Sequence, residues 1–350
     1  MPYQHSAPRP SFLSVGGIIT AAGVSYAGHL YGQFDRRDTD ADERRNAQRC
    51  LNFLSGHTGT SNNAKESALS RHVSNLDRHG VTHIRSVLSP ASAEKWDATV
   101  ARQVAKKELG GCIVPVGGAL GRTHCRLPKR TARQRANRPE EESDRIYDEM
   151  VKISEGQCPG NGGGVRLKDI AAQYFASKGI SADQFDVAQL QLLLASPEST
   201  HQVWHRDNVS PGLTVLIALR DVDSNGPTEI ILRSHRGNEH NFLGNVLWPN
   251  NDSSFAEDGL EERTLLASID KGDAIMYDSR CLHRGRGYGK SDGGNDQVAT
   301  DSFGDRPVLV IRFDAKATPA PGTGLVGNTL AKWEGSLLAF ACTMLTWLGL

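Results

Sequence analysis

Between residues 187 and 313, short apolar runs alternate with turn residues, and this pattern constrains the fold more than any other feature. Clusters such as Asp223–Pro227 have the Asp, Ser, Asn, Gly and Pro residues typical of turns. Strands at this spacing indicate an antiparallel sandwich or jelly roll, mainly β with flanking helices, rather than alternating strand–helix units. The predicted strands are Val187–Ala195, His201–Asp207, Leu213–Leu219, Glu229–Leu232, Ala274–Tyr277 and Val308–Phe313.

The tripeptide His205-Arg206-Asp207 and the distant His283 are candidate metal ligands. Alternate side chains of a strand point to the same face, so His205 and Asp207 can offer an imidazole and a carboxylate to one ion. Two histidines and one carboxylate with open positions are the ligand set of non-haem Fe(II) oxygenases. The alternative is that both histidines are ordinary residues of a sheet core, satisfied by hydrogen bonds.

Four segments occur in a characteristic order: QVWHRD, NGPTEIILRSH, GDAIMYDSRCLHRG and RPVLVIRF. In this order they resemble the phytanoyl-CoA dioxygenase-like family of Fe(II)/2-oxoglutarate oxygenases. The family's opening segment resembles residues 76–105, where Ser89 is a natural helix N-cap and Pro90 a natural first helical residue. The resemblance spans residues 72 to 315 and implies a double-stranded β-helix, a cupin-like jelly roll, with iron between its two sheets.

The resemblance also implies a cosubstrate. His205, Asp207 and His283 match the family's iron ligands, which leave positions for 2-oxoglutarate and O2. Arg306 matches the arginine that binds the distal carboxylate of 2-oxoglutarate, where a guanidinium can pair bidentately. Thr228 is expected to offer the cosubstrate a hydroxyl.

Two departures from the family pattern accompany these matches. Arg306 lies further beyond His283 than is usual in the family, so residues 286–305 are interpreted as a loop insertion. Arg312 has the same strand parity as Arg306 and is the reserve candidate for 2-oxoglutarate. Arg233 stands where the family commonly has glycine, which affects loop geometry more than catalysis.

The leading functional hypothesis is an Fe(II)- and 2-oxoglutarate-dependent dioxygenase that hydroxylates a small or lipid-like organic substrate and releases succinate and CO2. One alternative is a catalytically silent β-helix binding protein. Another is a cupin-like metal enzyme that does not use 2-oxoglutarate. The formal net charge is zero, which gives no general electrostatic attraction to nucleic acid, so none is expected as a partner.

Three segments are expected along the chain. Residues 1–71 are an N-terminal extension, with a possible targeting or anchor segment between Pro10 and Phe34. Residues 72–317 form the dioxygenase domain, with insertions near 110–165 and 286–305. Residues 318–350 are a linker and a hydrophobic tail that either dips into a membrane or packs on the domain. We therefore expect a cytoplasmic or membrane-associated protein.

Several other conspicuous residues are interpreted as structural. The basic run from Arg122 to Arg138 is followed at once by acidic residues and is interpreted as a solvated, mixed-charge insertion; the alternative is a patch for a partner or an anionic substrate. The six cysteines form no CxxC pair, which argues against a zinc ribbon or a disulfide framework. His235 is expected to brace a loop, Cys281 to be buried and inert, and Asp273 to be a turn residue. His201 is not expected to bind the metal, and Trp204 is expected to pack in the core rather than to stack on substrate.

Overall fold

A computed structural model describes most of the region with the family motifs. The described residues are 48, 50–52, 54–55, 68–106, 113–115, 121–127, 142–157, 165–197, 199–202, 205–223, 225–236, 264–287 and 305–319. The chain divides into two units, Met1–Glu43 and Arg44–Leu350, and every described residue belongs to the second.

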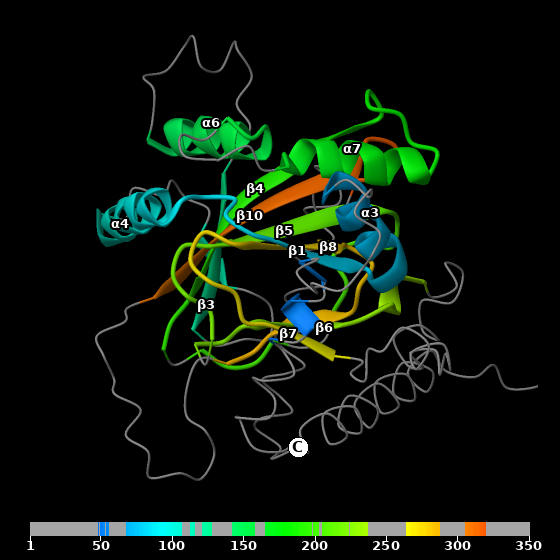
Figure 1. Ribbon diagram of the computed structural model, residues 1–350. Coiled ribbons are helices and arrows are strands. Elements are labelled where there is room, and N and C mark those ends of the chain that lie inside the picture. Colours follow the sequence, from blue (N-terminus) through cyan, green and yellow to red (C-terminus); the bar gives the residue numbers. More distant parts are fainter. Residues whose placement is uncertain are drawn as a thin grey trace, which may run out of the picture. The chain divides into compact units, whose positions relative to one another are not determined.

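The second unit combines helices with antiparallel strands (Figure 1). The helices are α3 (Ala68–His79), α4 (Pro90–Lys106), α6 (Glu142–Ser154), α7 (Leu167–Ser177) and the 3-10 turn η1 (Ser234–Arg236). The strands are β1 (Val81–Ile84), β2 (Ile113–Pro115), β3 (Arg122–Leu127), β4 (Phe185–Ala195), β5 (Gly212–Ala218), β6 (Thr228–Ile231), β7 (Thr264–Ala267), β8 (Ala274–Asp278), β9 (His283–Gly285) and β10 (Arg306–Ala315).

The strands form two sheets, as the sequence predicts for a jelly roll. The larger sheet has the order β1-β8-β5-β10-β4-β3-β2, and the smaller sheet has the order β7-β6-β9. Every pairing between the described strands is antiparallel. The crossing order, in which strands distant in sequence become neighbours, is the wound topology expected of this fold.

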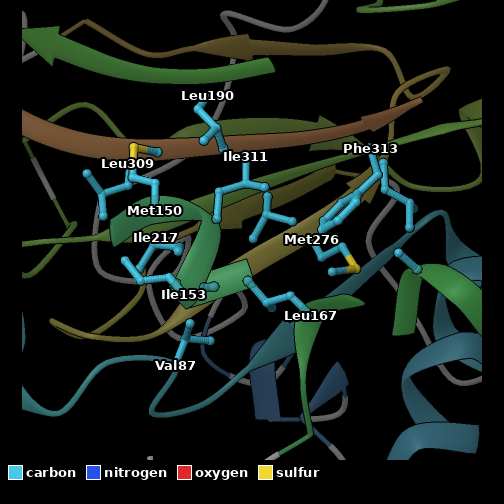
Figure 2. Packing of buried hydrophobic residues seen from close by; sticks show 14 of the residues in the cluster. Val87, Met150, Ile153, Leu167, Leu190, Ile217, Met276, Leu309, Ile311 and Phe313 are labelled. Atoms are coloured by element: carbon cyan, nitrogen blue, oxygen red, sulfur yellow. The ribbon is translucent and has the colours of Figure 1, made fainter. Parts of the chain in front are cut away.

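Strand alternation gives the larger sheet two different buried faces. On β10, Leu309, Ile311 and Phe313 pack with the helices, as Figure 2 shows for neighbours such as Met150 and Ile153. The even-numbered Val308 and Val310 instead pack with residues of the smaller sheet, including Ile230 and Leu265. Both faces of the sheet are therefore apolar and covered, which explains why its strands read as nearly continuous apolar runs.

Helix α4 begins as its sequence predicts. Pro90 is its first residue, and the Ser89 hydroxyl accepts a hydrogen bond of 3.2 Å from the amide of Ser92. Proline suits this position because its missing N–H would have no helical partner there. The N-cap and the first-residue proline are thus confirmed.

Two local predictions are wrong. Residues 201–207 do not form a strand in their described part, where an isolated bridge pairs His205 with His283. Within the predicted insertion near 110–165, β2 and β3 extend the larger sheet beyond β4, and α6 packs on that sheet. Arg122 was assigned to a solvated run, yet it is buried in β3 with 1% exposure.

The two terminal segments, including the apolar stretches of residues 10–34 and 335–350, lie outside the described residues, as does Trp204. The same holds for most of the predicted insertion at 286–305. Within the described ranges, none of the helices has both the length and the apolar character needed to cross a membrane.

Candidate metal centre and cosubstrate pocket

The structure brings the three predicted metal ligands together. One ligand atom from each of His205, Asp207 and His283 lies within 4.8 Å of the other two. The His205–His283 bridge makes this possible, because each residue donates its amide to the carbonyl of the other at 3.0 Å. Asp207 is fixed by a third backbone bond, from its amide to the carbonyl of Ser279 at 2.9 Å.

The ring of His283 is oriented by its own backbone. Its Nδ1 lies 3.0 Å from the carbonyl oxygen of Cys281, an acceptor, so Nδ1 carries the proton and donates. The other nitrogen, Nε2, then has a lone pair and lies 3.8 Å from Asp207 Oδ1. A hydrogen bond that fixes the tautomer in this way is common for metal-binding histidines.

Asp207 contacts a row of three residues that lie opposite one another on neighbouring strands of the larger sheet. Tyr277 of β8 pairs with Thr214 of β5, which pairs with Arg312 of β10. The Thr214 hydroxyl donates to Asp207 Oδ2 at 2.8 Å, and the Tyr277 hydroxyl lies 3.2 Å from the same oxygen. Arg312 Nη2 donates to the Asp207 carbonyl at 3.3 Å. The row therefore orients the carboxylate that would face a metal.

Local electrostatics favour metal binding. Burial by itself would raise the pKa of Asp207, but the Arg312 guanidinium, with His283 and His205, holds that pKa well below its usual range. Burial also lowers the pKa of His283 from 6.5 to about 4, and His205 adds to this effect. Near neutral pH this pair therefore offers a carboxylate and a neutral imidazole, the forms that bind cations.

Burial raises the pKa of Tyr277 well above its usual value, so its hydroxyl stays protonated. That hydroxyl also lies 3.1 Å from His283 Nε2. Neither Tyr277 nor Thr214 was among the candidate residues drawn from the sequence. Strand alternation carried the only signal for them, since both lie on the face of their strands that the second sheet covers.

A cavity between the sheets begins next to this row. The empty space along it, open solvent included, amounts to about 260 Å³. Leu216 and Ile275, one alternate position along β5 and β8 from Thr214 and Tyr277, line it at one end. Thr228 and Arg306 line it as well, among otherwise apolar side chains.

The two candidate arginines of β10 have different surroundings. Both point to the same side of the sheet, as their parity predicts, but Arg306 lines the cavity and Arg312 contacts Asp207. Their Cα atoms are six residues apart on one strand, or about 20 Å. Arg312 thus lies at the ligand cluster, and Arg306 lies beyond the apolar part of the cavity wall.

The remaining candidate residues have structural contacts. His235 is buried, with Nε2 3.2 Å from the carbonyl of Asp77, so it braces a loop as expected. Burial raises the pKa of the Cys281 thiol, which donates to the Gly80 carbonyl at 3.4 Å. Asp273 accepts from His83 Nε2 at 2.9 Å. His201 Nδ1 accepts from the amide of Gly287 at 3.2 Å.

The backbone conformation at Arg233 explains why the family commonly has glycine at this position. Its φ is +63°, in the left-handed region that glycine adopts without steric cost. Its amide donates to the His79 carbonyl at 2.8 Å, which fixes this backbone conformation. The substitution is thus accommodated locally and does not alter the ligand cluster.

Comparison with known proteins places the chain in a family. A model of the phytanoyl-CoA dioxygenase family (PhyH) matches residues 76–288, which is more than half of the chain. The protein belongs to this family of iron- and 2-oxoglutarate-dependent oxygenases, and it is therefore an oxidoreductase. The donor set of His205, Asp207 and His283 fits Fe(II).

Solved structures of low sequence identity are also similar. SnoN, an α-ketoglutarate-dependent epimerase from nogalamycin biosynthesis, is 17% identical over 71% of this chain and 81% of that chain, with a TM-score of 0.45. EctD from S. alaskensis, solved with 2-oxoglutarate and 5-hydroxyectoine, is 16% identical over 76% of this chain and 82% of that chain, with a TM-score of 0.45. No curated protein matches the sequence.

Proposed function

We propose that the protein hydroxylates a small or lipid-like organic substrate and converts 2-oxoglutarate and O2 to succinate and CO2. The observation that carries this proposal is the convergence of the His205, Asp207 and His283 ligand atoms within 4.8 Å. The class of substrate is taken from the family, which is named for a dioxygenase of phytanoyl-CoA.

In this proposal His205, Asp207 and His283 hold Fe(II), which supplies the activation of O2. Arg306 would pair with the distal carboxylate of 2-oxoglutarate, and the Thr228 hydroxyl would donate to the same cosubstrate. Two features support these roles: both side chains line one cavity, and that cavity begins beside the residues that orient Asp207. Its apolar wall would exclude water from the cosubstrate and strengthen the ion pair with Arg306.

The test is substrate-independent turnover of the cosubstrate. Full-length protein supplied with Fe(II), 2-oxoglutarate and O2 should release succinate, measured by chromatography. His205→Ala should abolish this release, because two ligands hold the metal much more weakly than three. Persistent succinate release by His205→Ala would remove His205 from the ligand set.

A matched control comes from the same segment. His201 lies four residues before His205, and its described ring contact is the amide of Gly287. His201→Ala should therefore retain succinate release. If the wild-type protein binds Fe(II) but shows no 2-oxoglutarate turnover, one of the two alternatives, a silent binding protein or a 2-oxoglutarate-independent metal enzyme, would replace the proposal.

A further inference from the structure

Arg122 lies on the same face of the larger sheet as Arg306. Ala195 of β4 pairs with Arg306 of β10 on one side and with Arg122 of β3 on the other. Residues directly opposite one another in a sheet point to the same face, so only the small Ala195 side chain separates the two arginines. That face is the one that borders the cavity, because Val308 and Arg306 line it.

The Arg122 guanidinium also lies beside the Thr228 end of the smaller sheet. Thr228 pairs with Gly285 across β6 and β9. A Cβ atom built on Gly285 would lie 2.5 Å from Arg122 Nη1 and 2.8 Å from its Cζ. The Arg122 guanidinium thus occupies the space where a side chain at position 285 would lie. Gly285 is the residue opposite Thr228, so the guanidinium lies at the Thr228 end of the smaller sheet.

The charge of Arg122 has no carboxylate partner in the described part of the chain. Its Nε donates to the Thr200 carbonyl at 3.3 Å, and its Nη2 donates to the Arg286 carbonyl. Its Nη1 is buried and has no hydrogen-bond partner there, although the side chain is 1% exposed. A buried guanidinium that meets only carbonyl oxygens is costly unless an anion joins it.

We propose that Arg122 is a second cation for the distal carboxylate of 2-oxoglutarate, and that this carboxylate accepts a hydrogen bond from Nη1. The inference rests on the proposed function and adds a residue to it. Arg306 and Arg122 would approach the carboxylate from either side of Ala195. Arg122 would also hold the segment before His205 against β9 through its two carbonyl bonds.

The experiment compares two keto acids that differ only at the distal end. 2-Oxoglutarate ends in a carboxylate, whereas 2-oxopentanoate has the same keto-acid group and ends in a methyl. Each is titrated calorimetrically into anaerobic, Fe(II)-loaded protein. Arg122→Gln should weaken 2-oxoglutarate binding about tenfold or more, and leave 2-oxopentanoate binding nearly unchanged, because only the former loses a charge-assisted bond.

Arg306→Gln should show the same selectivity. His124→Gln is the matched control, since His124 lies on the same face of β3, two residues from Arg122, and should leave both affinities unchanged. Arg122→Lys, which keeps a cation, should recover part of the 2-oxoglutarate affinity. It also serves as the informative variant if Arg122→Gln does not fold.

The outcomes separate the inference from the proposed function. If the Arg122 variants bind both keto acids equally more weakly, or bind both as the wild type does, the inference is wrong. Arg122 would then serve only to hold the backbone carbonyls of Thr200 and Arg286. If Arg306→Gln selectively weakens the binding of 2-oxoglutarate and Arg122→Gln does not, the inference is overturned and the proposed function stands. If the wild-type protein binds neither keto acid, the proposed function itself fails.

Discussion

At the scale of single residues, the orientation of Asp207 depends on neighbours that bind no metal themselves. The Thr214 hydroxyl donates to Asp207 Oδ2 at 2.8 Å. Thr214→Val keeps the shape of the side chain but removes this donor, so the carboxylate loses one of the bonds that direct it. Metal affinity should fall about tenfold to a hundredfold, measured by anaerobic Fe(II) titration.

Thr214→Ser is the control for this prediction, because it keeps the hydroxyl and should bind metal nearly as the wild type does. Unchanged affinity in Thr214→Val would mean that Tyr277 and the backbone of Asp207 suffice to orient the carboxylate. The two variants together separate hydrogen bonding from packing at this position.

The sequence predicted the ligand cluster but not the residues that support it. The pattern of His205, Asp207 and His283 is specific in its ordered setting, and the structure brings the three side chains together. Arg122 and Thr214 carry no local pattern, since their position depends on which strands become neighbours. Pairing of β3 with β4 depends on contacts distant in sequence, which no short motif encodes.

At the scale of elements, helix α7 is tied to the turn between β8 and β9. The Tyr174 hydroxyl donates to Asp278, which also pairs with Arg280 at 2.7 Å. Tyr174→Phe removes a buried bond to a charged group and should lower the free energy of unfolding by about 1.5–3 kcal/mol, measured by urea denaturation. Metal affinity should change little, because the Asp278–Arg280 pair still shapes the turn.

Ser177→Ala provides a comparison on the same helix. Among the described residues, its hydroxyl bonds only to the Tyr174 carbonyl within the helix, at 2.7 Å, so its loss should cost much less. Equal losses in the two variants would mean that the contact with Asp278 adds nothing beyond a local helix bond. A large drop in the metal affinity of Tyr174→Phe would show that α7 positions His283 through this turn.

Strand alternation explains which element predictions succeeded. Leu213–Leu219 and Val308–Phe313 were predicted as strands from their apolar runs, and β5 and β10 contain nearly all of these residues. The segment from His201 to Asp207, which has no such apolar run, was also predicted as a strand. Its described part is held to β9 by a bridge instead, so the prediction of its secondary structure was wrong.

At the scale of the whole molecule, buried histidines make stability depend on pH. Burial lowers the pKa of four histidines from 6.5 to about 4, namely His72, His124, His235 and His283. Between these values the unfolded chain binds protons that the folded protein does not, so stability is full above 6.5 and falls as the pH drops towards 4. Each histidine contributes at most about 1.4 kcal/mol per pH unit.

Urea denaturation of the metal-free protein at several pH values tests this prediction. The midpoint should fall steadily below about pH 6.5, and these histidines should add no slope above it. A midpoint that stays level down to about pH 5 would mean that these four rings accept protons in the folded state. His235→Gln should make the decline shallower, because one of the four groups is then absent.

The alternation of β10 has an evolutionary consequence. Arg306 and Arg312 face the space between the sheets, while Leu309, Ile311 and Phe313 face the helices. One residue gained or lost inside β10 would exchange these two sets and turn leucine and phenylalanine towards the proposed iron site. Residues gained or lost before Arg306 change no side chain's direction, so natural selection can vary the length of that connection freely while it must conserve the length of the strand.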